Sequence, residues 1–521
     1  MRFSYTVMHA WPPLAWLAHC PRDGARCAVF HGSAVEATDD WFCEAVWDGA
    51  FAAGDFDRTD VVFGSGGRLR DGRVTFVSSG STVDRLHSLE TSDAAWVSNS
   101  LPCLLSMVGG AVDPTYPGYF PDFKSISRGL SRYARGLATS AGIVRITYFH
   151  NLTWDHGRLG EAPKPSAERP LATFTAYRDF LKRTIAGLVE NMTARDRAGS
   201  LRLLGTISSG YDSATAAALA RPYGLTEAVS FGSSSSGDPD SGELIADALG
   251  VRLTIFARHA WRAATFPEVP FVASDAKGED VYFKGAEAQL GGRVLLTGFH
   301  GDRVWDKRAA TNEDLVRGDQ SGLSLSEYRL WVGFLHCPLP FAGVRQARAI
   351  GAISRSRDMA PWDSGGHYSR PICRRILEEA GVPRDAFGRW KKTASVLFFA
   401  QEGFLSPASL VDYRTWLDHH APEWHRRGLV PPTLSADDPD PWRGPRHATA
   451  RLLEGLAHMA PRRLWYLRSA AQRIVILGRR ERLFRHLFPW ALERAKQRYA
   501  ATVALEPPPQ PPAPLAAGLP G

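Results

Sequence analysis

One stretch of the sequence combines residue types that suit phosphate chemistry. Residues 201–207 form a short apolar run, Ser208 to Ser213 form a turn of small polar residues, and an alanine-rich segment follows as far as Ala220. This pattern predicts a buried strand, a tight turn and a helix. Serine hydroxyls and free backbone N–H groups at such a helix start suit phosphate or pyrophosphate. Beside a polyphosphate, the carboxylate of Asp212 is most simply a Mg²⁺ ligand.

A second stretch places chemistry-bearing residues directly after an apolar run. Residues 294–297 read as a buried strand, and a glycine loop with the sequence Gly298-Phe299-His300-Gly301-Asp302 follows it. Because histidine titrates near neutral pH, His300 is a candidate base, although a packed histidine or a phosphate contact explains it equally well. Asp302 is a candidate site carboxylate, and the structural alternative is an aspartate that caps a helix.

A third stretch is basic. An amphipathic helix is predicted from Arg370 to Gly381, and a turn opened by Pro383 leads to Lys391 and Lys392. The alternative for the two lysines is an ordinary solvated turn. Upstream of this stretch, Glu327 is another candidate base, and its alternative is a helix-surface acid paired with a nearby arginine.

The elements around these stretches alternate between strand and helix. A periodic helix is predicted to begin at Phe174. Beyond the turn from Ser208 to Ser213, which we call the phosphate-loop candidate, the pattern predicts a strand at 227–231, a helix at 242–249 and a strand at 251–256. Such alternation predicts an α/β fold with a parallel, doubly wound sheet whose ligand lies at the carboxyl ends of the strands.

The first 158 residues are strand-rich instead. Five short strands are predicted there: 3–7, 27–31, 60–63, 74–78 and 95–98. The glycine-rich run from Gly64 to Gly67 is interpreted as a turn, and Asp71-Gly72 as a hairpin turn.

The motif Ser208-Ser209-Gly210-Tyr211-Asp212-Ser213 resembles the Ser-Gly-Gly-x-Asp-Ser pyrophosphate loop of the N-type ATP pyrophosphatases, with Ser209 in place of the first glycine. The order of the three stretches is similar to that in asparagine synthetases and β-lactam synthetases, and the segment 96–105 resembles the late part of their N-terminal domain. The resemblance implies a degenerate amidotransferase-like Ntn domain (an αββα sandwich) over 1–158, an ATP pyrophosphatase domain over 159–420 and a basic helical extension over 421–521.

The resemblance also implies roles for individual residues. The pyrophosphate would be cradled by Ser208, Ser209, Gly210 and Ser213, with Gly298 beside it, and Mg²⁺ would be held by Asp212 and Asp302. In the family a lysine contacts the α-phosphate of ATP and stabilises the charge that develops in the transition state. Lys391 matches that lysine, and Lys392 is the adjacent alternative.

Two departures from the family change the expected chemistry. Glutamine-using members employ an N-terminal cysteine nucleophile, whereas this chain has Arg2 at that place, so no glutaminase activity is expected. Asparagine synthetases have a glutamate and β-lactam synthetases a tyrosine where this chain has Phe299. Because phenylalanine cannot transfer a proton, the base must differ here, and His300 and Glu327 are the candidates.

The resemblance implies a ligase that uses ATP and Mg²⁺ to adenylate a small-molecule or peptide carboxylate, releasing pyrophosphate. A nitrogen nucleophile would then displace AMP; it would be ammonia, a substrate amine, or an amine of the same molecule, as in β-lactam and lasso-peptide cyclisation. Two alternatives remain: a pyrophosphatase-loop enzyme that modifies tRNA, and a non-catalytic scaffold.

The length, charge and cysteine content of the chain limit these interpretations. The 521 residues allow two or three domains, and the net charge of +8 is concentrated in the C-terminal fifth. The six scattered cysteines, without a C-x-x-C pair, fit a reducing cytoplasm, and neither a signal peptide nor a spanning helix is expected. The basic amphipathic stretch 462–499 can lie on a membrane surface or pack on the protein, and we favour packing. No nucleic-acid partner is expected, and the Pro/Ala-rich residues 506–521 are expected to be disordered.

Overall fold

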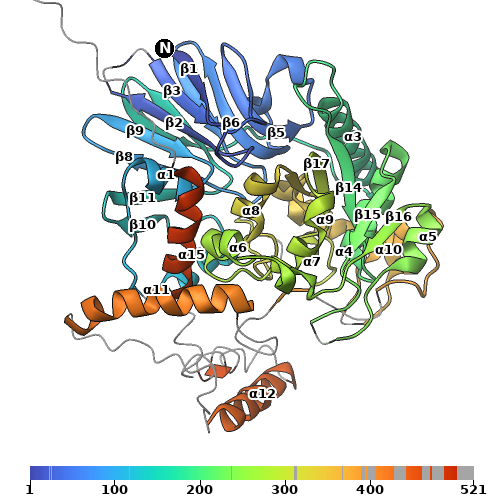
Figure 1. Cartoon of the computed structure of the whole chain (residues 1–521). Helices are drawn as coiled ribbons and strands as arrows, with labels where there is room; N and C mark the ends of the chain where they lie inside the picture. Colours follow the sequence, from blue (N-terminus) through green and yellow to red (C-terminus); the bar gives the residue numbers. More distant parts are fainter. Residues whose placement is uncertain are drawn as a thin grey trace, which may run out of the picture.

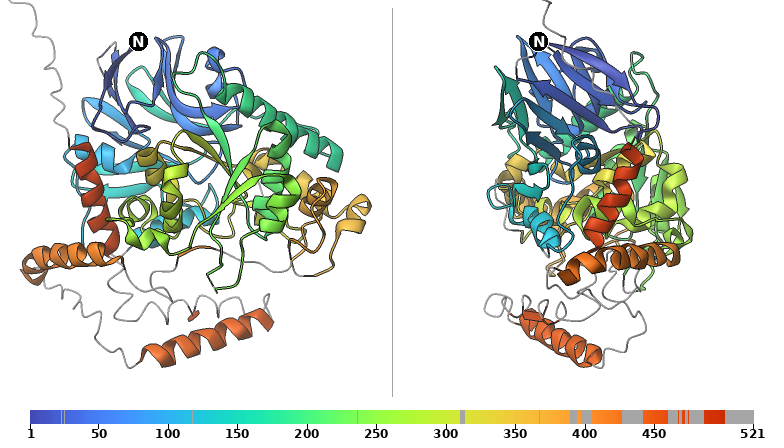
Figure 2. Two further views of the ribbon diagram at one scale, coloured as in Figure 1. Left: turned by 45° about the vertical axis from the view of Figure 1, so that its right-hand side comes forward. Right: turned by 60° about the vertical axis from the view of Figure 1, so that its left-hand side comes forward.

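The chain is a mixed α/β protein with parallel and antiparallel sheets. Its structure is a computed structural model, which describes residues 1–22, 24, 26–116, 118–235, 237–309, 314–366, 368–388, 394–396, 405–426, 442–459, 467, 470, 471, 474 and 486–500. Within these residues three sheets form, of seven, six and five strands. Figures 1 and 2 show the first two sheets at the end of the molecule that holds the N-terminus, and α12 (Arg443–Met459) at the opposite end.

The first two sheets are built by the N-terminal part of the chain. In spatial order, the seven-stranded sheet contains β1 (Arg2–Val7), β3 (Arg26–His31), β2 (Trp16–Pro21), β9 (Ala94–Ser98), β8 (Leu86–Glu90), β11 (Gly142–Thr147) and β10 (Gly136–Thr139). The six-stranded sheet contains β13 (Arg158–Ala162), β12 (Asn151–Asp155), β7 (Arg73–Val77), β6 (Val62–Arg70), β5 (Trp41–Trp47) and β4 (Glu36–Ala37). The five short strands expected in this part are thus present, and β13 runs across the boundary expected after residue 158.

The two sheets pack against each other through large apolar side chains. One buried cluster joins Trp16 of β2 with Phe42 of β5, Phe76 of β7 and Trp154 of β12. The indole of Trp16 also donates a hydrogen bond to Ser65 Oγ in β6, at 3.0 Å. Alternation along each strand places these residues on the inner faces. Helices α1 (Leu101–Met107) and α2 (Tyr119–Lys124) follow the sheet strands and contribute to a second apolar cluster.

The interpretation of Gly64 to Gly67 as a turn is wrong. These glycines lie inside β6 and pair with β5. A Cβ at Gly64 would lie 2.0 Å from the carbonyl oxygen of Glu44, and one at Gly66 would lie 2.2 Å from that of Phe42. Glycine is therefore required by the close approach of two strands rather than by a change of direction. The turn at Asp71-Gly72 between β6 and β7 is confirmed, because both residues have positive φ.

The third sheet is wholly parallel. Its spatial order is β16 (Arg252–Ile255), β15 (Glu227–Ser230), β14 (Arg202–Thr206), β17 (Arg293–Thr297) and β18 (Leu335–Pro338). The chain moves outward from β14 to β15 and β16, and then returns to the other side of β14 with β17. The strand order therefore reverses between β14 and β17, and ligands of open parallel sheets bind at the carboxyl side of such a switch point.

The helices of this region follow the predicted order. They are α3 (Phe174–Met192), α4 (Tyr211–Ala220), α5 (Glu243–Leu249), α6 (Val269–Asp275), α7 (Gly301–Val304), α8 (Leu325–Val332), α9 (Ala347–Ser354) and α10 (Pro371–Glu379). The predicted helix starting at Phe174 and the helix ending before Gly381 are both confirmed. One apolar cluster continues from the N-terminal sheets through α3 and α4 to α10, so the two parts share a core.

The C-terminal part adds α11 (Pro407–Arg426), α12 and α15 (Leu487–Lys496), followed by a turn at Gln497–Tyr499. Helix α15 is buried: Trp490 is fully enclosed, and its indole and the guanidinium of Arg494 both donate to Asp412 of α11, at 2.8 Å. The described part of the basic C-terminal stretch thus packs on the protein. The tail at 506–521 lies outside the described residues. Among the helices that are described, none combines the length and apolar character that a bilayer crossing needs.

A buried ionic cluster ties the parallel-sheet region to the N-terminal sheets. The guanidinium of Arg329 in α8 donates to both carboxylate oxygens of Glu44 in β5, at 2.6 and 3.1 Å, and to Asp84 at 2.8 Å. All three side chains are almost completely buried. The interior therefore tolerates the negative charges of Glu44 and Asp84 only because the guanidinium of Arg329 neutralises them.

Replacing Arg329 by methionine keeps the volume of the side chain and removes its charge. Two buried carboxylates would then lose their partner, and we expect the free energy of unfolding to fall by about 3–5 kcal/mol. Urea unfolding measures this loss. Arg252, whose side chain is 75% exposed in its pair with Glu227, is the matched control, and Arg252→Met should cost less than about 1 kcal/mol. Equal losses in the two variants would contradict the role assigned to Arg329.

Candidate functional site

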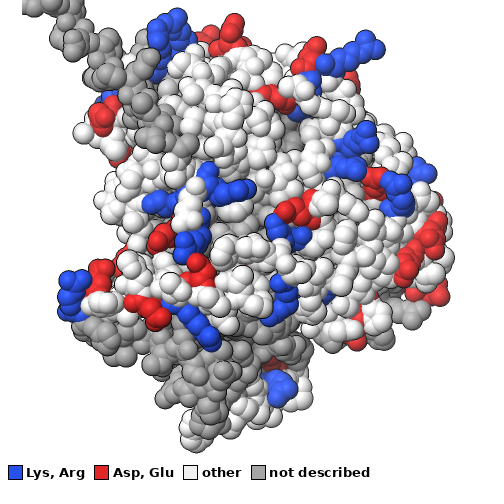
Figure 3. Space-filling view, in the orientation of Figure 1, with Lys and Arg blue, Asp and Glu red and all other residues white. Residues whose placement is uncertain are grey.

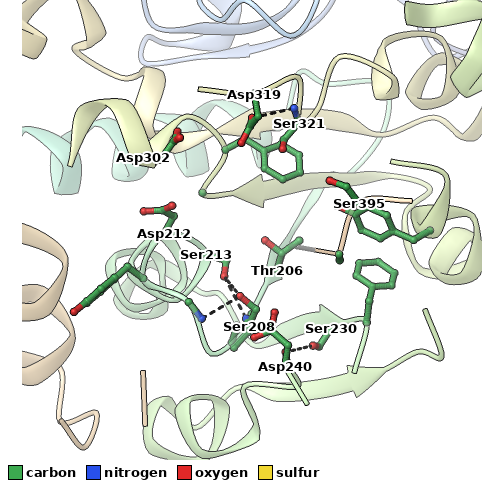
Figure 4. Close-up of a pocket in the computed structure, with 18 of the residues that line it drawn as sticks. Thr206, Ser208, Asp212, Ser213, Ser230, Asp240, Asp302, Asp319, Ser321 and Ser395 are labelled. Carbon is green, nitrogen blue, oxygen red and sulfur yellow. Dashed lines mark hydrogen bonds between the residues drawn. The ribbon is translucent and has the colours of Figure 1, made fainter. Parts of the chain in front are cut away.

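A polar pocket lies at the switch point of the parallel sheet. It has a volume of about 1010 Å³ with the open space at its mouth included. Residues that follow β14, β15 and β17 line it, together with residues from the segments at 282–283, 319–321, 368–370 and 394–395. Figure 4 shows the labelled serines and aspartates converging on it. The sequence-predicted residues Ser208, Gly210, Asp212, Ser213, Gly298, His300 and Asp302 are all brought together here.

The turn after β14 presents a helix start to the pocket. Helix α4 begins at Tyr211, so the amides of its first turn have no acceptor within the helix. The two hydroxyls of Ser208 and Ser213 lie 3.0 Å apart, and Ser208 Oγ also accepts from the N–H of Gly210 at 3.3 Å. These contacts hold the turn closed around the helix start. The arrangement of hydroxyls and amides can bind an oxyanion.

The residue that departs from the family motif has a structural partner. Both the N–H and the hydroxyl of Ser209 donate to Asp240 Oδ1, at 2.9 and 2.6 Å. Asp240 lies in the loop after β15, so the serine fixes the phosphate-loop candidate to the neighbouring strand end. A glycine at this position would keep only the backbone bond. The substitution is therefore compatible with a formed loop.

The loop after β17 is pressed against the first turn of α4. A Cβ added to Gly298 would lie 2.2 Å from the carbonyl carbon of Asp212, and one added to Gly301 would lie 2.5 Å from its carboxyl carbon. Only glycine allows this approach. The same loop then starts α7, in whose first turn Asp302 lies, so two carboxylates from different strands border one pocket.

Arg370, which sequence reasoning used only as the start of a helix, is a central residue of the pocket. Its side chain is 2% exposed, and burial lowers its pKa to about 10. Its Nη1 is in ion-pair contact with Asp212 Oδ1, yet neither this nitrogen nor Nε makes a hydrogen bond of acceptable geometry, and neither does Asp212 Oδ1. A buried cation and a partly exposed carboxylate are thus paired at the edge of the pocket, where a ligand can contact both.

The number of side chains that could ligate a metal ion at the pocket is small. In the described part of the chain, no group of three or more His, Cys, Asp or Glu side chains is arranged to hold a metal ion. Asp212 and Asp302 could supply two carboxylates, and Mg²⁺ commonly takes one or two carboxylates with the remaining ligands from phosphates and water. The partly exposed carboxylate of Asp212, which lines the pocket, fits such a partly built site.

His300 lines the pocket but is poorly suited to act as a base. It adopts a left-handed backbone conformation with φ of 75°, and its ring stacks on Phe341 at 4.5 Å. Burial, followed by the charge of Arg317, lowers its pKa to about 3. The ring is therefore neutral near pH 7, and a base with so low a pKa accepts a proton only weakly.

Glu327 is not among the residues that line the pocket. Its carboxylate accepts hydrogen bonds from the hydroxyl of Tyr499 at 2.5 Å and from the indole of Trp331 at 2.9 Å. Burial raises its pKa. The expected alternative, an exposed acid paired with arginine, is wrong too, because the C-terminal turn covers this side of α8. Glu327 serves as a structural acceptor rather than as a base of this pocket.

Lys391 and Lys392 lie outside the described residues. The chain on both sides of them does reach the pocket. The N–H of Gly388 donates to the carbonyl oxygen of Ser209 at 2.9 Å, and Ala394 and Ser395 line the pocket. Three extended residues span about 10 Å. A lysine three residues after Gly388 is therefore connected to the phosphate-loop candidate by a short length of chain.

The far side of the pocket is aromatic. Phe231, at the end of β15, packs edge-on against Tyr282 and Phe283, at 4.6 and 5.0 Å between ring centroids. Phe299 follows at 6.5 Å from Phe283. Phe299 belongs to the predicted glycine loop and Phe231 to the predicted strand end, whereas Tyr282, Phe283, Asp319 and Ser321 come from segments for which the sequence offered no motif.

Charged side chains of both signs are mixed on one face of the molecule. On the face that Figure 3 draws, Lys and Arg side chains are interspersed with Asp and Glu.

Comparison with known proteins adds nothing to the geometry, since no protein-family model and no curated protein matches this chain.

The low pKa of His300 predicts a pH-dependent loss of stability. In the unfolded chain histidine binds a proton below about pH 6.5, whereas folded His300 stays neutral down to about pH 3. Acidification therefore favours the unfolded state. Relative to His300→Gln, the free energy of unfolding of the wild type should fall by up to about 1.4 kcal/mol per pH unit below pH 6.

Urea unfolding at several pH values between about 7 and 5 measures this difference. The matched control is His156→Gln, because the side chain of His156 is 96% exposed, and we expect no pH-dependent difference for it. A constant offset between wild type and His300→Gln across this range would contradict the buried, neutral state of His300.

Proposed function

We propose that the chain is an ATP-dependent ligase of the asparagine synthetase and β-lactam synthetase type, which forms an amide or lactam through an acyl-adenylate. The observation that carries the proposal is the convergence of three separate sequence segments on one pocket. They supply the helix start at Tyr211, the carboxylates of Asp212 and Asp302, and the buried guanidinium of Arg370.

In this proposal the chain's own groups bind the pyrophosphate part of ATP. The hydroxyls of Ser208 and Ser213 and the amides of the first turn of α4 face the phosphate oxygens, helped by the positive end of the helix dipole. The guanidinium of Arg370 supplies bidentate hydrogen bonds to a phosphate. Ser209 contributes by fixing the loop to Asp240, not by direct contact.

Asp212 and Asp302 would hold Mg²⁺. The ion would neutralise the phosphates and favour departure of pyrophosphate when it is bound. The same carboxylates set the register between α4 and the loop after β17. Because Arg370 lies against Asp212, binding a phosphate would also give the guanidinium an acceptor better placed than the carboxylate.

Lys391 is proposed to stabilise the adenylation transition state. The support for this is its sequence motif together with the position of Gly388 on the phosphate-loop candidate and of Ala394 at the pocket. Lys392, which also belongs to the motif, is the adjacent alternative for this contact. In the transition state negative charge builds on the oxygens of the α-phosphate, and a nearby cation lowers its energy.

The N-terminal sheets are proposed to be an Ntn-like αββα domain without glutaminase activity. The support for this is the resemblance, in which Arg2, exposed at the start of β1, takes the place of the cysteine nucleophile. Nitrogen must then come from an amine or from ammonia. We place the protein in the cytoplasm, where ATP and Mg²⁺ are available.

Two other functions are less well supported. A tRNA-modifying enzyme would call for a basic surface that follows the phosphate backbone, and Figure 3 draws acids among the bases on its face. A non-catalytic scaffold would have no need of a buried cation paired with a carboxylate at the edge of an open pocket.

Exchange of labelled pyrophosphate into ATP tests the proposal. The twenty proteinogenic amino acids and simple mono- and dicarboxylic acids are screened with Mg²⁺, and at least one should support exchange. Asp212→Asn and Lys391→Ala should each lower exchange by at least about 100-fold. The first removes a proposed Mg²⁺ ligand, and the second removes the cation proposed to stabilise the α-phosphate in the transition state. Asp247, an exposed acid on α5, gives the matched control Asp247→Asn, which should retain exchange.

Absence of exchange with every carboxylate would contradict the ligase proposal. Equal exchange in the wild type and in both site variants would contradict the roles assigned to Asp212 and Lys391. RNA that copurifies with the protein and is released by salt would favour the tRNA alternative.

The close approach of Gly298 gives a separate prediction. In Gly298→Ala the added methyl group would meet the backbone of Asp212 and Ser213 at 2.2 and 2.4 Å and force the two loops apart. Affinity for Mg²⁺ and α,β-methylene-ATP, measured by calorimetry, should fall at least about tenfold, or about 1.4 kcal/mol. In the control Gly199→Ala nothing lies within 4 Å of the new Cβ, so unchanged affinity is expected. Unaltered binding by Gly298→Ala would argue against the pocket as the nucleotide site.

A further inference from the structure

Four carboxylates border the pocket, and the sequence motifs or the proposed function assign roles to three of them. Asp240 holds Ser209, and Asp212 and Asp302 lie beside the helix start where phosphate and metal are proposed. The fourth is Asp319, which belongs to none of the sequence motifs. Its side chain is exposed at the pocket, and its carboxylate accepts a hydrogen bond from the N–H of Ser321 at 3.1 Å.

Asp319 stands on the wall across from the phosphate-loop candidate. Figure 4 shows Asp319 and Ser321 on one side of the pocket, and Ser208 and Asp240 on the other. Phe299 lies on the same side as Asp319, because a Cβ added to Gly322 would come within 2.8 Å of its ring. With phosphates bound at the helix start, a second substrate would approach the reacting carbon from the wall that carries Asp319.

The loop that carries Asp319 is fixed by the N-terminal sheets. Arg317 is buried, and its backbone N–H donates to Ser127 at 3.0 Å while its guanidinium donates to the carbonyl oxygen of Thr82 at 3.1 Å. Asp314, at the other end of the loop, accepts from the N–H and hydroxyl of Ser131 at 2.7 and 2.8 Å. The N-terminal part therefore positions one wall of the pocket.

The pocket otherwise offers few groups that could take a proton from an amine. The ring of His300 is stacked on Phe341, Phe299 has no ionisable group, and Glu327 is not at the pocket. A carboxylate that is ionised at neutral pH can both attract an ammonium ion and accept a proton from nitrogen.

We propose that Asp319 binds the nitrogen nucleophile as a primary ammonium group and acts as the base of the amide-forming step; this rests on the proposed ligase function. The rings of Tyr282, Phe283 and Phe299 line the pocket beside it. They provide cation–π contact for the ammonium group and apolar contact for the carbon that adjoins it. The acceptor class is therefore a primary amine on an apolar chain rather than free ammonia.

The proton balance of the step is simple. The carboxylate of Asp319 takes one proton from the bound ammonium, which becomes a neutral amine, and passes this proton to solvent at the pocket mouth. Its lone pair forms a C–N bond to the acyl carbon of the adenylate, and the bond from that carbon to the phosphate oxygen breaks, releasing AMP. The nitrogen then carries one proton too many, and the phosphate of the departing AMP takes this proton.

Asp319→Asn tests the proposal, using the carboxylate that supports the strongest pyrophosphate exchange. Two nucleophiles are compared, n-butylamine, which is protonated at neutral pH, and hydroxylamine, which is largely neutral there. Amide formation from n-butylamine should fall by about 100-fold, the usual contribution of a general base. Exchange and hydroxamate formation should stay within about fivefold of wild type, and Asp319→Glu should recover part of the n-butylamine activity.

Other outcomes separate the two proposals. Loss of exchange in Asp319→Asn would assign the residue to nucleotide or metal binding and overturn this inference while leaving the ligase function intact. Equal loss with both nucleophiles, or a wild type that turns over only ammonium chloride, would also overturn it. Absence of exchange in the wild type would count against the ligase function itself.

Discussion

The contact between the loop after β17 and the first turn of α4 is the constraint on which the site depends. Two glycines, Gly298 and Gly301, allow this loop to lie against Asp212 at distances that no side chain would permit. Because β14 and β17 are neighbours in the sheet, their carboxyl ends already open toward the same crevice. The glycines bring the two loops into contact, and the charged groups they carry then border a single pocket.

The N-terminal sheets influence this pocket although none of the residues that line it belongs to them. Arg329 joins α8 to β5 through a buried ionic cluster, and Arg317 joins the loop of Asp319 to the segment before β8. Each contact crosses from one part of the chain to the other. One role of these sheets is therefore to hold a wall of the site in place. Their contribution is to position the loop, and they need not bind substrate.

The sequence predicted the parts of the structure that are encoded locally. An apolar run followed by Ser208 to Ser213 and an alanine-rich segment gave the strand, loop and helix start, and the glycine loop placed Asp302 at the same edge. In the N-terminal part, β1, β3, β7 and β9 followed from their short apolar runs, the start of β6 was predicted, and the remaining strands were not. These predictions succeeded because each depends on neighbours within a few residues.

The errors and omissions concern contacts between distant residues. The run at 64–67 was taken for a turn because the approach of β5, which requires glycine, is not visible in the local pattern. Glu327 was considered as a base because periodicity cannot show that Tyr499, 172 residues away, covers it. Arg370 and Asp319 reach the pocket only through the tertiary fold. Lys391 lies outside the described residues and remains a prediction of its motif.

The most direct test of the central claim is a crystal structure of the protein with α,β-methylene-ATP and Mn²⁺, in which anomalous scattering locates the metal. The account predicts an anomalous peak in contact with the carboxylates of both Asp212 and Asp302, with the triphosphate at the start of α4 and within reach of Arg370. A nucleotide bound elsewhere, or a metal that touches neither carboxylate, would contradict it.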